Sequence, residues 1–148
     1  MEKTEEEEGN KFTDKYNILK EIGRGTEGII YLTEDLKNNR KVAVKQINIK
    51  DENNLKNVLK EIETVMSLEH INIIKYYEYF KNVSIDEFTL DEQIEIYLIM
   101  ELCDCNLDEI IQQKRQTLEV FDSNFLQDII MQICSSLKEI HQHNIVHR

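Results

Sequence analysis

The 148-residue sequence contains no proline and no tryptophan, has only three cysteines, and lacks any long apolar run. A helix needs about 20 apolar residues to cross a membrane, so the short runs exclude a membrane span. Four consecutive glutamates at 5–8 exclude a secretory signal at the amino terminus. An odd number of cysteines without regular spacing argues against a disulfide framework and for a reducing compartment. We therefore expect a cytoplasmic protein, with the nucleus as the alternative.

Positive charge is also scarce. Eighteen lysines and arginines stand against 29 aspartates and glutamates, which gives a formal net charge of −11. Such a surface repels the phosphates of DNA, RNA and anionic lipids, so we expect neither nucleic-acid binding nor direct membrane binding. The segment 1–13 is acidic and carries a single aromatic residue, Phe12. It buries too little area to offset the entropy of ordering, which predicts a disordered acidic tail over 1–13.

Three of the four glycines lie close together, at Gly23, Gly25 and Gly28. Glycine lets a backbone turn sharply and approach a polyphosphate closely. The β-branched and aromatic segment 29–33 follows, which predicts a second strand and not the helix that a dinucleotide-binding fold requires. No Gly-Lys-Ser or Gly-Lys-Thr closes the run, so a Walker-type loop is excluded. The pattern indicates a glycine-rich hairpin between strands at 16–23 and 28–34.

A third strand is predicted at 41–47. Its two-residue period places Val42 and Val44 on one face, and Ala43 and Lys45 on the other. Further strands are expected at 73–80 and 94–101. The acidic segment 81–93 between them is longer than a hairpin turn requires, so we expect an exposed insert there.

Apolar residues recur at helical spacing in two segments, which predicts amphipathic helices at 52–68 and 123–143, and a short helix is expected at 106–114. The two apolar stripes comprise Leu55, Val58, Leu59, Ile62, Val65 and Met66, and then Leu126, Ile129, Ile130, Ile133, Leu137 and Ile140. Helical phase does not distinguish Glu61 from Glu63, because both flank the first stripe.

The order of these features resembles the Ser/Thr-type eukaryotic protein kinases. The resemblance rests on the glycine-rich hairpin, on Val42-Ala43-Val44-Lys45, on Lys60-Glu61-Ile62 ahead of His70-Ile71-Asn72-Ile73, and on the final His147-Arg148. It implies an α+β fold with a protein-kinase-like small lobe, a five-stranded antiparallel sheet plus one helix, over about 14–101. A hinge at about 101–106 and the first two helices of the large lobe at about 106–148 would complete a partial kinase domain.

The resemblance implies an ATP site. Lys45 would reach the α- and β-phosphates, and the family's register selects Glu61 over Glu63 as its partner. The alternative is that Lys45 has no role in ATP binding and is an ordinary lysine at the edge of a sheet. The expected nucleotide contacts are Ile22, Gly23, Arg24, Gly25, Thr26, Glu27, Gly28, Ile30, Ala43, Lys45, Met100, Glu101 and Cys103. Glu27 departs from the family pattern, since its carboxylate would face phosphate and weaken binding.

Mg²⁺ would accompany ATP, with ligands expected beyond residue 148. No metal site is predicted within the chain, because Cys103 and Cys105 lack a second pair of ligands. His70 is expected to be structural and to hold the end of the helix at 52–68. Ile71 stands where the family usually has proline.

The sequence stops at His147-Arg148, which matches the first two residues of the kinase His-Arg-Asp catalytic loop. The family's reaction is transfer of the ATP γ-phosphate to Ser or Thr hydroxyls of a protein substrate. Without the aspartate, we expect this chain alone to be inactive. The alternative to a protein kinase is a catalytically silent kinase-like scaffold. A third and more remote alternative is a nucleotide-binding domain that is not a kinase.

Overall fold

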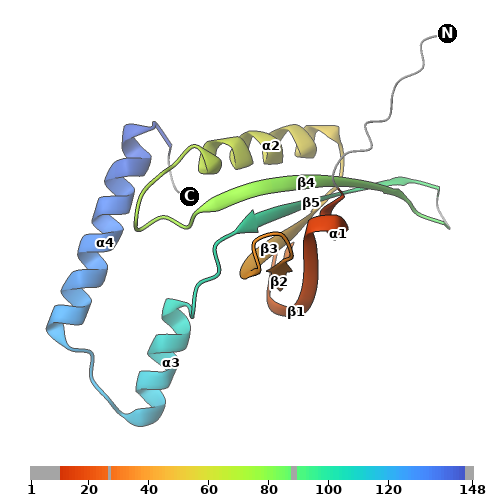
Figure 1. Cartoon of the computed structure of the whole chain (residues 1–148). Coiled ribbons are helices and arrows are strands. Elements are labelled where there is room, and N and C mark those ends of the chain that lie inside the picture. Colours follow the sequence, from red (N-terminus) through yellow and green to blue (C-terminus); the bar gives the residue numbers. More distant parts are fainter. Residues whose placement is uncertain (1–10, 27, 88–89, 146–148) are drawn as a thin grey trace, which may run out of the picture.

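The computed structural model describes residues 11–26, 28–87 and 90–145. Five antiparallel strands form one sheet in the order β1-β2-β3-β5-β4 (Figure 1). The strands are β1 (Tyr16–Gly25), β2 (Gly28–Asp35), β3 (Arg40–Ile49), β4 (Tyr76–Ile85) and β5 (Glu92–Met100). The helices are α1 (Phe12–Lys15), α2 (Glu52–Met66), α3 (Leu107–Thr117) and α4 (Ser123–Gln142). The expected α+β fold is confirmed: α2 lies beside the sheet, α3 and α4 follow it, and the short α1 precedes β1.

Apolar side chains cover both faces of the sheet. On one face Ile62 of α2 packs with Ile49, Ile96 and Leu98. On the other face Tyr16, Val42, Val44 and Ile99 form a second cluster. Alternating residues of β3 and β5 supply both clusters, as the two-residue period of a strand requires. α2 therefore marks one face of the sheet, called here the α2 face.

α2 begins and ends close to its expected bounds. The Asp51 carboxylate accepts a hydrogen bond from the Asn54 N–H at 2.8 Å and caps the first turn. Ile62 is buried, while Glu61 and Glu63 on either side of it are exposed. The helix ends at Met66, two residues before the expected Leu68.

α1 includes Phe12 and Thr13, which the sequence assigned to the tail. Phe12 lies in α1 and stacks on Tyr16 and Tyr97, with ring centroids 5.5 and 4.5 Å apart, and it meets Phe80 edge-on at 5.9 Å. Residues 12 and 13 therefore belong to the folded part and not to the tail expected over 1–13. Three different strands supply this aromatic surface, so local composition could not reveal it. Residues 1–10 of that tail lie outside the described residues.

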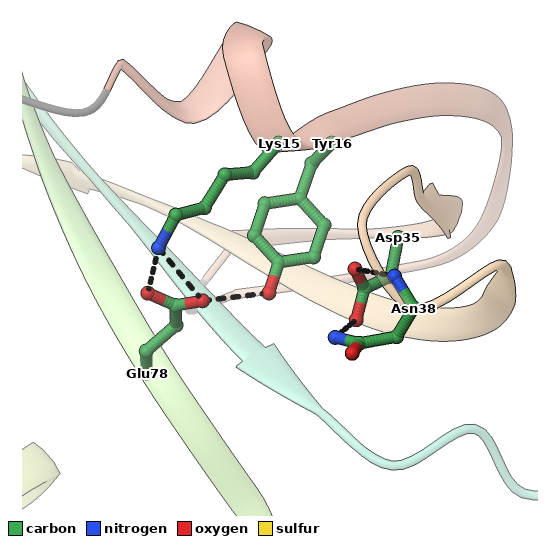
Figure 2. A network of polar contacts seen from close by, with 5 residues as sticks. All are labelled: Lys15, Tyr16, Asp35, Asn38 and Glu78. Atoms are coloured by element: carbon green, nitrogen blue, oxygen red, sulfur yellow. Dashed lines mark hydrogen bonds and ion pairs between the residues drawn. The ribbon is translucent and has the colours of Figure 1, made fainter.

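A polar network ties this amino-terminal segment to β4, as Figure 2 shows. The Lys15 ammonium and the Tyr16 hydroxyl both donate to the Glu78 carboxylate, at 3.0 and 2.8 Å. Burial, and then the hydrogen bond to Glu78, raises the pKa of Tyr16. In the same view Asn38 donates its backbone and side-chain N–H groups to Asp35, at 3.1 and 2.7 Å. These contacts stabilise the packing on the face of the sheet opposite α2.

The segment 81–93, expected to be an exposed insert, forms the end of a hairpin. β4 and β5 continue their pairing through Val83 opposite Ile94 to Ile85 opposite Glu92. The Asp86 N–H then donates to the Asp91 carbonyl at 3.0 Å. β-branched residues in both strands favour this extension. The expected exposure is found at Val83 and Ile85, and residues 88 and 89 lie outside the described residues.

α3 and α4 lead away from the last residue of β5 (Figure 1). α3 begins with a capping box in which Asn106 and Glu109 exchange hydrogen bonds, and it runs three residues beyond the expected Lys114. α4 matches the expected helix at 123–143 within one residue. Much of its apolar stripe is exposed, with Ile130 and Ile133 at 59% and 50%. Among the described residues, no helix is both long enough and apolar enough to cross a membrane.

Candidate nucleotide-binding site

The pairing of β2, β3 and β5 brings the central residues of the candidate site side by side. Lys45 lies opposite Ile30 of β2 and Leu98 of β5, and Ala43 lies opposite Met100. Residues that pair directly across antiparallel strands share a face of the sheet. Leu98 belongs to the cluster under α2, so this row lies on the α2 face. Ala43 and Lys45 thus share the face that their two-residue spacing predicts.

The glycine-rich hairpin closes beside this row, since Gly23 lies opposite Ile30 and Gly25 lies opposite Gly28. Gly28 has φ +148°, and a Cβ there would meet the Gln46 carbonyl oxygen at 2.0 Å, so the fold requires glycine. A Cβ on Gly25 would meet no heavy atom within 4 Å. The space at Gly25 is therefore open to a ligand that approaches the backbone.

Arg24 and Glu27 of the hairpin were also expected to contact the nucleotide. The Arg24 guanidinium donates to both Glu21 carboxylate oxygens, Nε to Oε1 at 3.0 Å and Nη2 to Oε2 at 2.7 Å. The hydrogen bond lowers the pKa of Glu21 and raises that of Arg24. The Arg24 side chain is thus engaged within its own strand, and a phosphate would compete with Glu21 for it. Glu27 lies outside the described residues, so its expected effect on phosphate stays a prediction.

The expected hinge leaves the sheet at the end of β5. Met100 is buried, and the Glu101 N–H donates to the Lys75 carbonyl at 2.9 Å. Because that donor is engaged, the carbonyl of Glu101 is the backbone group that suits the adenine contact expected there. Cys103 follows two residues later and is exposed. Partial burial, and then the charges of Glu101 and Asp104, raises the pKa of the Cys103 thiol.

Glu61 and Glu63 are both exposed on α2. Burial, and then the negative charge of Glu61, raises the pKa of Tyr76. Tyr76 lies opposite Met100 and packs on the α2 face. No ion pair between Lys45 and Glu61 is found within the described parts of the chain, and this pairing stays a prediction.

His70 makes structural hydrogen bonds, but they join the segment after α2 to α4 and do not hold the end of α2. The Asn72 N–H donates to His70 Nδ1 at 3.1 Å, so Nε2 carries the proton and donates to Ser135 Oγ at 3.0 Å. Ser136 Oγ donates to the Asn72 carbonyl at 3.0 Å. The histidine therefore connects the segment after α2 to α4. No local pattern could have revealed a contact between residues 65 positions apart.

The residues present suit a nucleoside triphosphate. Ile30 offers half-buried apolar surface, Lys45 carries a cation, and Gly25 leaves the hairpin backbone accessible, while Ala43 and Met100 lie buried on the same face. Within 11–26, 28–87 and 90–145, no three His, Cys, Asp or Glu side chains are placed to hold a metal ion. Cys103 and Cys105 are exposed free thiols. His147 and Arg148 lie outside the described residues.

A five-stranded sheet with one helix, a glycine-rich hairpin beside a strand lysine, and a chain exit into helices together define a protein-kinase small lobe. The family model for the protein kinase domain matches residues 16–148. This chain belongs to the protein kinase family. The resemblance to Ser/Thr-type kinases that the motifs indicated is thereby confirmed.

Several individual kinases are similar over most of the chain. A mitogen-activated protein kinase homolog of Petunia hybrida is 33% identical over 136 residues, which covers 90% of this chain and 33% of the relative. Calcium-dependent protein kinase 4 of Plasmodium falciparum is 32% identical, over 93% of this chain and 24% of the relative. Extracellular signal-regulated kinase 1 of Dictyostelium discoideum is 31% identical, over 95% and 26%. The chain thus spans only 24% to 33% of the length of these relatives.

Proposed function

We propose that this chain holds the ATP-binding part of a Ser/Thr protein kinase. The observation that carries the proposal is the row of Ile30, Lys45 and Leu98 on the α2 face, with the open space at Gly25 beside it. Similarity to mitogen-activated and calcium-dependent protein kinases supports the same reaction class. ATP bound there supplies the phosphoryl group that the reaction transfers to a protein hydroxyl.

Each part of the site has its own role in holding ATP. Ile22, Ile30 and Ala43 contact the adenine ring, whose edge meets the backbone of Glu101 and Cys103. Lys45 steadies the α- and β-phosphates, and Glu61 orients Lys45. The backbone of the hairpin from Gly23 to Gly28 covers the phosphates. The main contribution of this lobe to catalysis is to hold the phosphates in a fixed position, because phosphoryl transfer depends on positioning and charge stabilisation.

As a 148-residue polypeptide, the chain binds ATP but transfers no phosphoryl group. In the family the aspartate after His-Arg accepts the proton of the substrate hydroxyl, and further residues hold Mg²⁺. Neither that aspartate nor an Asp-Phe-Gly segment is among these 148 residues. In a longer chain that includes them, the same lobe serves transfer from ATP to Ser or Thr residues of protein substrates.

The test is binding of a fluorescent ATP analogue to the chain and its displacement by unlabelled ATP. Lys45→Met should weaken binding about tenfold or more, because the phosphates lose a cation. Lys41→Met is the matched control, since it removes the same charge from the same strand and should change little. Equal losses in the two variants, or no displacement by ATP, would overturn the proposed site. Phosphoryl transfer above background by the 148-residue chain would contradict its proposed inactivity.

A further inference from the structure

The β4–β5 hairpin projects beyond the rest of the sheet. β3 pairs with β5 only as far as Ile49 opposite Ile94, whereas β4 pairs with β5 on to Ile85 opposite Glu92. The last rungs are therefore two-stranded, and Figure 1 shows this end reaching away from α3 and α4. We call residues 81–87 and 90–93 the hairpin arm.

One side of the hairpin arm is an open sheet edge. β4 is last in the strand order, and no strand within the described residues pairs with its outer side. An edge strand presents backbone N–H and C=O groups that can pair with another strand. Proteins usually protect such edges with charged or bulged positions. The ladder from Glu78 to Ile85 is regular, so no bulge interrupts the arm.

The hairpin arm also carries exposed apolar side chains. Val83 and Ile85 are 49% and 64% exposed, and their spacing of two places them on one face. Val83 lies opposite Ile94, which packs against the cluster under α2. The apolar α2 face thus continues past the helix as an exposed strip. Leu90 in the turn is 77% exposed.

The charge of the hairpin arm indicates which kind of strand could pair with it. The described residues near the tip include four carboxylates, Asp86, Glu87, Asp91 and Glu92, and the arm's one lysine is Lys81. A second copy of this chain would bring the same carboxylates to the contact and be repelled. A basic segment would gain attraction both from the tip and from the formal net charge of −11.

We propose that the hairpin arm is a docking site for an extended, basic segment of a partner protein. The segment adds to the outer edge of β4 as a further strand, in which apolar residues alternate with lysine or arginine. Its apolar residues contact Val83 and Ile85, and its basic residues are attracted by the negative charge of the tip. The contact uses no residue of the candidate nucleotide site, so the two functions can be tested separately.

The test uses the chain attached sparsely to a sensor surface by its amino terminus, so that copies do not meet. The probe is a ten-residue peptide of alternating valine and lysine. Two peptides of the same length serve for comparison, one of valine and glutamate and one of serine and lysine. We expect only the valine–lysine peptide to bind, and its binding should weaken as salt is added.

Two pairs of variants separate the apolar from the charged contribution. Ile85→Thr should weaken binding about tenfold, whereas Ile18→Thr, on the opposite edge strand β1, should leave it unchanged. Glu92→Lys should also weaken binding. Asp128→Lys, on α4, makes the same change in charge and should leave binding unchanged. Circular dichroism checks that each variant keeps its secondary structure.

Several results would overturn the proposal. Failure of the valine–lysine peptide to bind is the first. Equal binding of the serine–lysine peptide would mean that charge alone attracts the probe, and equal losses in Glu92→Lys and Asp128→Lys would mean the same. Binding that appears only when the chain is densely attached would indicate pairing between copies.

Discussion

Ile30 of β2 lies directly opposite Lys45 of β3, and Gly23 of β1 lies opposite Ile30 in turn. This line across three strands places the glycine-rich hairpin next to the lysine, although about 20 positions of sequence separate them. A shift of the β2–β3 register by one residue would turn Lys45 to the other face of the sheet. Gly28 helps to hold this register, because its backbone passes too close to Gln46 for any side chain.

The two glycines of the hairpin should respond differently to alanine. Gly28→Ala should destabilise the fold by about 1–2 kcal/mol or more, since φ +148° is unfavourable for alanine and its Cβ would meet Gln46. Gly25→Ala should leave stability nearly unchanged and weaken binding of the ATP analogue, because the methyl group fills the open space. Urea unfolding and analogue binding measure the two effects. The opposite assignment of effects would mean that the space at Gly25 is not used by phosphate.

The register of α2 can be tested by neutralising one carboxylate at a time. In a full-length protein, Glu61→Gln should reduce phosphoryl transfer by orders of magnitude, because Lys45 loses the group that orients it. Glu63→Gln is the matched control and should have little effect. Both positions are exposed, so neither change should alter stability much. If Glu63→Gln were the damaging variant, the assignment of Glu61 would be wrong.

Local periodicity explains which parts of the molecule could be predicted from the sequence. The shared face of Ala43 and Lys45 follows from the two-residue period of one strand, and burial of Ile62 follows from the 3.6-residue period of one helix. The packing of Phe12 and the hydrogen bond of His70 to α4 could not be predicted, because each depends on residues distant in sequence. The hairpin arm was missed because its acidic composition is also typical of a loop.

Thr33 offers a test of an unsatisfied polar group. Its hydroxyl is fully buried in β2 and has no hydrogen-bond partner among the described residues. Thr33→Val keeps the shape and removes the hydroxyl, so it should stabilise the fold by about 1 kcal/mol. Thr64→Val is the control, since the Thr64 hydroxyl donates to the Lys60 carbonyl and its loss brings no gain. Urea midpoints compare the two, and a destabilised Thr33→Val would show that the hydroxyl is satisfied.

Asp35 should make stability depend on pH in the acid range. Burial alone would raise the pKa of this carboxyl, but hydrogen bonds from Asn38 and Arg40 lower it below its ordinary value of 3.8. The contribution of a group with a lowered folded pKa is complete above 3.8 and is lost as pH falls through the folded value. Asp35→Asn should therefore destabilise the fold at neutral pH by about 1–3 kcal/mol, with a smaller deficit in acid.

Urea midpoints of the Asp35→Asn chain and the unchanged chain at several pH values measure this difference. Asp128→Asn, on exposed α4, is the control and should show a small effect at every pH. A deficit of Asp35→Asn that stays constant from neutral to acid pH would contradict the lowered pKa.

The exposed stripe of α4 should govern how the isolated 148-residue chain behaves. Leu126, Ile130 and Ile133 are 45%, 59% and 50% exposed, and Met131 beside them is 63% exposed. Contiguous apolar surface of this kind promotes association. We expect the chain to bind a hydrophobic dye strongly and to form large species in light scattering. The double variant Ile130→Gln, Ile133→Gln should reduce both signals, whereas Ile71→Gln, at an isolated position that is 97% exposed, should not. A monodisperse wild-type chain that melts cooperatively and binds no dye would show that α4 does not drive association.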